Sequence, residues 1–163
     1  MKFDFKARKT EQKEYTIAPE NILEVHDLRV NIRVDDYTLN AVRGVNFSMK
    51  KGETLGLVGE SGCGKSVTSK EILGINPENC SSTGEVLYRT KSGKVMNLLT
   101  LEKDGDVLRG IRGAEMAMIF QEPMTAFSPL YTIGNQLAEI ILIHEPKTTK
   151  AEARNRVLQM LER

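Results

Sequence analysis

Eight residues, Gly-Glu-Ser-Gly-Cys-Gly-Lys-Ser at positions 59–66, constrain this sequence more than any other feature. The three glycines let a backbone curl closely around an anion, because no side chain stands in the way. The backbone N–H groups of residues 62–66 can then point inward, and a helix starting at Lys65 adds the positive end of its dipole. The sequence therefore predicts a phosphate-binding loop for a nucleoside triphosphate and its magnesium ion.

Each residue type in this loop suits one part of a triphosphate. We expect Lys65 to reach the β- and γ-phosphates as a point charge, and the Ser66 hydroxyl to complete the coordination shell of magnesium. Cys63 should serve as a small residue whose backbone N–H matters more than its thiol. The predicted nucleotide-binding residues of the loop and first helical turn are Gly59, Ser61, Gly62, Cys63, Gly64, Lys65, Ser66 and Val67.

The segments around the loop predict a strand–loop–helix unit. Residues 54–58 carry three large aliphatic side chains interrupted only by a glycine, which predicts a buried strand running into the loop. A helix is expected from Lys65 to about Leu73, with Gly74 as its stop. Residues 116–120, Met-Ala-Met-Ile-Phe, predict a second fully apolar strand.

Alternating segments elsewhere predict an antiparallel sheet. Apolar and polar residues alternate at 28–34 and 45–49, which is typical of strands with one face in water, and the pair at 35–36 suits a turn. Residues 85–88 and 95–99 predict two further short strands.

Beyond residue 131 the apolar period becomes helical. Apolar residues recur at helical spacing from 133 to 141, and Pro146 should end that helix. Thr149 and Glu152 have the spacing of a capping box, which predicts a final helix. The predicted apolar faces are Ile133, Leu137, Ile140 and Ile141 on the first of these helices, and Val157, Leu158 and Leu161 on the second.

Composition excludes several classes of protein. The 163 residues are 40% hydrophobic and 28% charged, as in ordinary globular domains, and a net charge of +1 gives no whole-chain attraction to nucleic acid. Two cysteines are too few for a disulfide framework or a zinc site, so we expect reduced thiols. Residues 1–21 lack the apolar core of a signal peptide and predict a charged, flexible extension. The longest aliphatic run, 140–143, is too short to span a bilayer.

Two stretches resemble a known family. The opening of an ATP-binding-cassette (ABC) transporter ATPase closely resembles residues 41–66, which begin Ala-Val-Arg-Gly-Val-Asn-Phe and end in the phosphate loop. The Q-loop region of the oligopeptide/dipeptide (or nickel) importer subfamily resembles residues 114–136, including Met-Ala-Met-Ile-Phe-Gln-Glu-Pro-Met-Thr. This resemblance implies an α/β fold: a P-loop NTPase core with an antiparallel β-subdomain at 22–131, and the beginning of a helical subdomain at 132–163.

The resemblance also implies roles for particular residues. Gln121 matches the Q-loop glutamine, which in the family contacts magnesium or the attacking water, so Lys65 and Gln121 are the expected catalytic residues and Ser66 and Gln121 the expected magnesium ligands. Tyr37 lies where the family often places a ring that stacks on adenine. Taken alone, Gln121 also suits an ordinary strand end and Tyr37 a half-exposed turn. Glu122 stands where many relatives have aspartate.

Partners follow from the same resemblance. It implies ATP with Mg²⁺, a second ABC ATPase subunit, transmembrane permease subunits and, indirectly, an extracytoplasmic solute-binding protein, with no nucleic acid. The expected location is the cytoplasmic face of the cell membrane. The family's signature, Walker B and switch-histidine motifs do not occur in residues 137–163. We therefore expect the N-terminal portion of a longer ATPase, which binds ATP but hydrolyses it negligibly alone.

Three alternatives stay open on the sequence. The first is a non-transport ABC protein acting on DNA or the ribosome, against which the balanced charge and compact spacing argue. The second is another P-loop enzyme, such as a small-molecule kinase or a GTPase, although no Asn/Thr-Lys-x-Asp guanine-reading motif occurs. The third is a catalytically inactive fragment.

Overall fold

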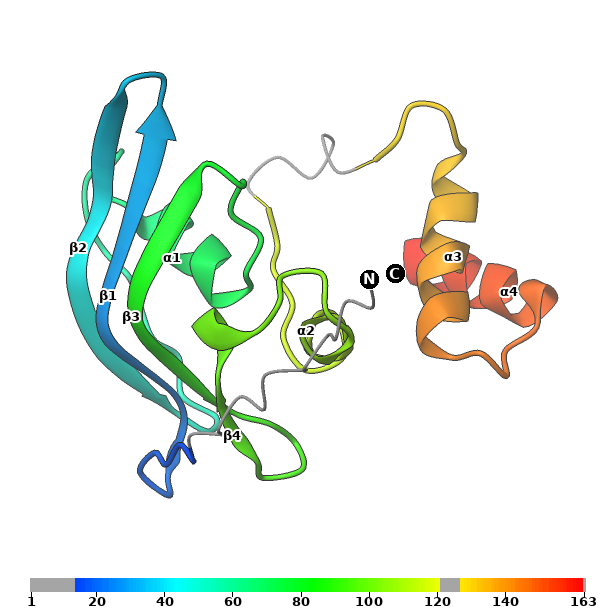
Figure 1. Cartoon of the computed structure of the whole chain (residues 1–163). Helices are drawn as coiled ribbons and strands as arrows, with labels where there is room; N and C mark the ends of the chain where they lie inside the picture. The colour runs from blue at the N-terminus through cyan, green and yellow to red at the C-terminus, as the bar shows by residue number, and fades with distance from the viewer. Residues whose placement is uncertain (1–13, 121–126, 163) are drawn as a thin grey trace, which may run out of the picture. The chain divides into compact units, whose positions relative to one another are not determined.

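The structure is a computed structural model that describes residues 14–120 and 127–162 (Figure 1). Its backbone divides into two compact units, with the division directly after Met116. An antiparallel sheet with two helices forms the first unit, and a pair of helices forms the second. Gln121 lies outside the described residues.

Four antiparallel strands form one sheet in the order β2-β1-β3-β4. The strands are β1 (Asn21–Val34), β2 (Tyr37–Lys50), β3 (Cys80–Arg89) and β4 (Val95–Asn97). The predicted turn at 35–36 joins β1 and β2, which pair along their whole length. Because β1 pairs with both β2 and β3, its side chains Val25, Leu28 and Val30 lie at the centre of the core and are fully buried.

A β-bulge explains why β1 is longer than its sequence pattern predicts. Leu23 and Val25 are buried on one phase of the alternation, whereas Leu28 and Val30 are buried on the other. Asp27 adopts a φ of 44°, and the register of β1 shifts between Val25 and Leu28. The extra residue of the bulge returns the apolar side chains of both halves to the core face. Because the alternation changes phase at the bulge, the sequence pattern does not predict a single strand of 14 residues.

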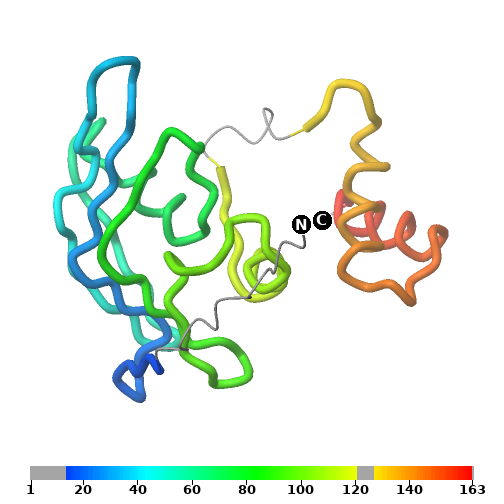
Figure 2. The backbone as a smooth tube through the Cα atoms, viewed as in Figure 1, coloured from blue at the N-terminus to red at the C-terminus, as the bar shows by residue number. Residues whose placement is uncertain are grey.

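The helices of the first unit cover one face of this sheet, as Figure 2 shows. The helix α1 (Lys65–Ile72) confirms the predicted start, and Gly74 follows it in the left-handed conformation, with a φ of 63°. A 3₁₀ turn, η1 (Leu98–Thr100), replaces the end of the predicted last strand, and α2 (Asp106–Ile111) is a helix that the sequence analysis did not predict. Leu108 and Ile111 of α2 join the core beneath β1 and β3.

The residues that precede β1 are fastened to β3. The guanidinium of Arg89 donates to the carbonyl oxygens of Ile17 and Ala18, at 3.1 Å each, and to that of Asn21 at 3.2 Å. The last part of the predicted extension therefore contacts the sheet, while residues 1–13 lie outside the described part of the chain.

The second unit is a helical hairpin of α3 (Ile133–His144) and α4 (Lys150–Leu161). The predicted capping box is confirmed, because the Thr149 side chain accepts from the backbone of Glu152 and the Glu152 carboxylate accepts from the backbone of Thr149. Glu145 and Arg156 join the helices through two hydrogen bonds of 2.6 and 3.0 Å. No helix within residues 14–120 and 127–162 combines the length and hydrophobicity needed to cross a bilayer.

The predicted apolar faces of this hairpin are only partly packed. On α4 the packed residues are Ala153 and Val157, whereas Leu158 and Leu161 are exposed. On α3, Leu137 and Ile141 are half-buried, but Ile133 and Ile140 are exposed. A hairpin packs each helix on a single neighbour, so it buries a narrower stripe than the full apolar face that the period marks.

The two predicted apolar strands are also wrong. Residues 54–58 and 116–120 belong to no strand, although Met116 forms an isolated bridge with Arg112, and Val58 and Ile119 are both 97% exposed. Continuous apolar runs form strands only when parallel neighbours cover them on both sides. The sheet of the described residues is antiparallel and pairs with neither segment, so Val58 and Ile119 remain in solvent, whereas Met116 packs against the core from outside the sheet.

The central position of Leu28 predicts a large effect of its truncation. We expect Leu28→Ala to lower the free energy of unfolding by about 2–5 kcal/mol, because a fully buried side chain leaves a cavity. Leu39→Ala, at a half-exposed position of the same sheet, should change it by less than about 0.5 kcal/mol. Urea denaturation measures both, and equal losses would contradict the assigned core.

The phenol of Tyr88 predicts a loss of stability at high pH. Burial, and then the hydrogen bond that its hydroxyl donates to Glu115 at 3.1 Å, raise the pKa of Tyr88 to about 12. An unfolded tyrosine ionises at a pKa of about 10, so this contribution is full below pH 10 and is lost as the pH rises through about 12. Between pH 10 and 12, the free energy of unfolding should therefore fall less steeply in Tyr88→Phe than in the wild type. Parallel curves would refute this.

Candidate functional site

The predicted phosphate loop lies directly before α1 and is exposed. Gly62 and Gly64 have φ values of 83° and 96°, a region that glycine enters without strain. Gly64 is also the N-cap residue of α1, and no side chain caps the helix there. The first N–H groups of α1 are thus free of side-chain acceptors, which is the arrangement that helix termini use to bind anions.

The loop is seated on strand β2. A Cβ atom on Gly64 would lie 2.6 Å from the carbonyl oxygen of Ala41 and 3.4 Å from a methyl group of Val42. A Cβ atom on Gly59 would lie 2.6 Å from the sulfur of Cys63, across the mouth of the loop. Gly64 is therefore required by close packing against the backbone of β2, and this packing fixes the start of α1 against the sheet.

Lys65 lies over the loop and closes it. Its Nζ donates to the carbonyl oxygens of Gly59 and Glu60, at 2.7 Å each, and lies 3.6 Å from the sulfur of Cys63. Hydrogen bonds with one ionised partner are about twice as strong as neutral ones, and the contacts of this ammonium group with carbonyls are already of that kind. A phosphate oxygen adds its own negative charge, so Coulomb attraction makes it a stronger partner than either carbonyl.

Polar groups hold the flank of α1 to the core. Thr68 and Glu71, three residues apart on the helix, are both buried. The Nδ2 atom of Asn76 donates to the Glu71 carboxylate at 2.6 Å and to the carbonyl oxygen of Val67 at 3.1 Å. A helix with few apolar residues thus gains a fixed orientation. The sequence reasoning missed these residues, although two polar residues at i and i+3 beside Val67 were an available signal.

Arg112 holds the opposite end of α1. Its Nε donates to the carbonyl oxygen of Leu73 at 2.8 Å, and its Nη2 donates to that of Gly74 at 2.7 Å. These carbonyls end the helix and have no partner within it, so a guanidinium satisfies them and also matches the negative end of the helix dipole. No pattern in the sequence joins Arg112 to a helix that ends 40 positions earlier.

The structure places the other predicted residues in different ways. Tyr37 is the first residue of β2 and is 80% exposed, five residues before Val42, which corresponds to about 17 Å along a strand. Val67 packs against the core, so only its backbone can face the loop. Gln121 lies outside the described residues. His26 and His144 are both exposed.

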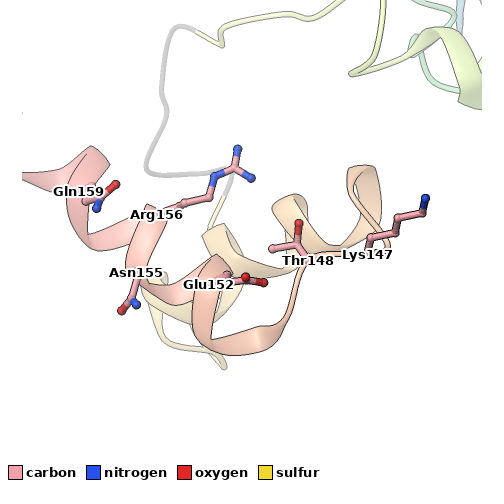
Figure 3. A pocket seen from close by; sticks show the side chains of 6 residues that line it. All are labelled: Lys147, Thr148, Glu152, Asn155, Arg156 and Gln159. Carbon is pink, nitrogen blue, oxygen red and sulfur yellow. The ribbon is translucent and has the colours of Figure 1, made fainter.

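A shallow hollow of about 490 Å³ lies in the second unit, on α4 and the turn before it (Figure 3). Its lining residues are Lys147, Thr148, Glu152, Asn155, Arg156 and Gln159. Two of its three charged residues are already engaged, because Arg156 pairs with Glu145 and Glu152 caps α4. The hollow therefore offers no free carboxylate to act as a general acid or base. In the part of the chain that the structure describes, no three His, Cys, Asp or Glu side chains group to hold a metal.

Comparisons with known proteins identify the same family as the sequence around the loop. The family model described as ABC transporter matches residues 42–163. The chain is 46% identical to a dipeptide transport ATP-binding protein of Bacillus subtilis, over 87% of this chain and 41% of that protein. It is 42% identical to a dipeptide transport ATP-binding protein of Lactococcus lactis, over 90% of this chain and 40% of that protein. It is 41% identical to an oligopeptide transport ATP-binding protein of Bacillus subtilis, over 86% of this chain and 38% of that protein. The chain thus spans about two fifths of the length of these relatives.

The seating of Gly64 predicts that two glycine substitutions differ. Gly64→Ala and Gly62→Ala each force a side chain into a left-handed conformation, which costs about 1–2 kcal/mol. Only Gly64→Ala also collides with strand β2, whereas a Cβ on Gly62 meets nothing within 4 Å. We therefore expect Gly64→Ala to lower the free energy of unfolding clearly more than Gly62→Ala, measured by urea denaturation. Equal losses would show that the loop is not seated on β2.

Proposed function

Because the chain belongs to the ABC transporter family, we propose that it is part of an ATP-binding subunit that powers uptake of peptides, or of a related small solute, across a membrane. The observation that carries the proposal is the N-terminus of α1, which has no side-chain cap and holds Lys65 within the loop. The printed functions of the relatives, dipeptide and oligopeptide transport, supply the class of solute.

The loop residues divide the binding of ATP between them. The backbone N–H groups at 62–66 would surround the phosphate oxygens, and Lys65 would exchange its two carbonyl partners for the β- and γ-phosphates. The exposed hydroxyl of Ser66, on the first turn of α1, would bind magnesium together with the phosphates. Magnesium bound in this way needs few protein ligands, which fits a loop that has no cluster of carboxylates.

Two further residues complete the proposed site. The ring of Tyr37 is exposed at the start of β2, the strand on which the loop is seated, so it would stack on adenine at the far end of the nucleotide. Gln121 would contact magnesium or the attacking water, as the family resemblance implies. ATP supplies the phosphoryl bond whose cleavage drives the cycle, while the residues of this chain bind it and orient its phosphates.

The assembly and its location are part of the same proposal. We infer a pair of ATP-binding subunits that bind permease subunits at the cytoplasmic face of the membrane, with a solute-binding protein acting through the permease. Within these 163 residues the family's Walker B and signature motifs do not occur. We therefore propose that this chain alone binds ATP without sustained hydrolysis.

The proposal predicts selective loss of binding in Lys65→Ala. Removing the ammonium should weaken the binding of ATP with Mg²⁺ at least about tenfold, because charge-assisted hydrogen bonds to phosphate disappear. Lys70→Ala, which removes the same charge from the last turn of α1, should bind ATP as the wild type does. Titration of a fluorescent ATP analogue, with unlabelled ATP or GTP as competitor, measures both variants.

Three outcomes of this experiment would contradict the proposal. Equal affinity in Lys65→Ala and the wild type would remove Lys65 from the site. A clear preference for GTP over ATP would favour a GTPase instead of an ABC subunit. Steady ATP turnover by the 163-residue chain that Lys65→Ala abolishes would show that the chain hydrolyses ATP without the missing motifs.

A further inference from the structure

The guanidinium of Arg112 fastens α1 at the end opposite to the phosphate loop. Its two hydrogen bonds, of 2.8 and 2.7 Å, reach two successive carbonyl oxygens, those of Leu73 and Gly74. A planar guanidinium spans both acceptors at once, whereas the ammonium of a lysine is a single point of charge. The geometry of the contact is therefore specific to arginine, although lysine carries the same charge.

Close packing surrounds this contact. Gly74 has a φ of 63°, and a Cβ atom there would lie 3.0 Å from Nη2 of Arg112 and 2.9 Å from a methyl group of Leu108. Leu108 is itself buried in the core. The end of α1 thus rests between a core side chain and the guanidinium, with little room to shift.

Arg112 is also the second residue of a compact turn at residues 111–116. The N–H groups of Glu115 and Met116 donate to the carbonyl oxygen of Ile111, at 2.9 and 3.0 Å, and Gly113 donates to that of Met116 at 2.7 Å. The carboxylate of Glu115 accepts from the hydroxyl of Tyr88 and from the backbone N–H of Lys91. The turn is therefore anchored on β3, and Arg112 extends from it to α1.

The short length of α1 makes this remote contact matter at the phosphate loop. Eight helical residues span about 12 Å, so the helix moves as a rigid rod. Its N-terminus touches β2 through Gly64, its flank touches Asn76, and its C-terminus touches Arg112. If the last of these contacts is lost, the rod can tilt about the other two, and the tilt moves the loop end where Lys65 begins the helix.

We propose that Arg112 is a positioning residue for nucleotide binding: by holding the last carbonyls of α1 it fixes Lys65 and the first helical N–H groups against the phosphates. Arg112 also joins that helix to the turn at 111–116, after which the chain leads to Gln121. A displacement of this turn is thereby transmitted to the phosphate loop. This inference rests on the proposed function, because it concerns the same nucleotide site.

The test compares Arg112→Met and Arg112→Lys with the wild type, using Arg109→Met as the matched control. Arg109 is an exposed arginine three residues earlier on α2. The first measurement is hydrogen–deuterium exchange without nucleotide, at the amide of Thr68, which donates to Gly64 at 2.9 Å, and at amides of β1. The second is the dissociation constants of ATP and ADP, each with Mg²⁺.

In Arg112→Met, we expect the amide hydrogen of Thr68 to exchange faster than in the wild type, while the amides of β1 exchange at the wild-type rate. The variant should also bind ATP about tenfold more weakly, as for a lost charged hydrogen bond. Its preference for ATP over ADP should fall, because a displaced Lys65 loses its γ-phosphate contact first. A smaller folded fraction would weaken both nucleotides equally. Arg112→Lys should lose about threefold in ATP affinity, since one of two carbonyls can still be reached, and Arg109→Met should match the wild type.

Several results would overturn the inference. Wild-type exchange at Thr68 and wild-type ATP affinity in Arg112→Met would do so, as would an equal loss in Arg109→Met. If Arg112→Met does not fold, Arg112→Lys decides, and wild-type values in both measurements refute the role. If the wild type itself binds no ATP, the proposed function fails, while the exchange measurement still shows whether Arg112 fixes α1.

Discussion

Everything at the phosphate loop depends on how α1 is held against the sheet. Its N-terminus is pressed on the carbonyl oxygen of Ala41 at Gly64, where any larger residue would collide. The core side of α1 offers only Val67 and Ile72 as apolar contacts, so a hydrophobic stripe alone cannot orient it. Directional contacts supply the orientation instead: the Glu71–Asn76 pair on the flank and Arg112 at the end. A binding loop needs this rigidity, because donors that move lose the benefit of being placed in advance.

The sheet below α1 is built to receive it. The bulge at Asp27 keeps Val25 and Leu28 on the core face, although the alternation of the sequence changes phase between them. The bulge presses on Gly84 of β3, where a Cβ atom would lie 2.5 Å from the carbonyl oxygen of Asp27. A long and strongly paired β1 thus holds β2 in place, and β2 carries both the seat of the loop and the exposed ring of Tyr37.

Much of this architecture could be predicted from the sequence, but not all of it. The glycines of the loop, the start of α1 and the capping box of α4 were predictable, because each depends on residues within a few positions of one another. The strands expected at 54–58 and 116–120 were not formed, because strand formation is decided by neighbours rather than by the apolar run itself. Of the proposed site, the loop residues were named from the sequence, whereas Asn76, Glu71 and Arg112, which hold α1, were not.

The sequence by itself determined the glycine-rich loop proposed to bind phosphate and the family that the chain resembles, since both are written in short contiguous patterns. Only the tertiary structure decided how that site is held. The contact of Arg112 with Leu73 joins residues 39 positions apart, and neither residue carries a local sign of the other. Local patterns report the conformations that a segment favours, whereas the packing of α1 between β2 and the turn at 111–116 selects one orientation. Long-range contacts fix that choice because their directional hydrogen bonds are satisfied in only one arrangement.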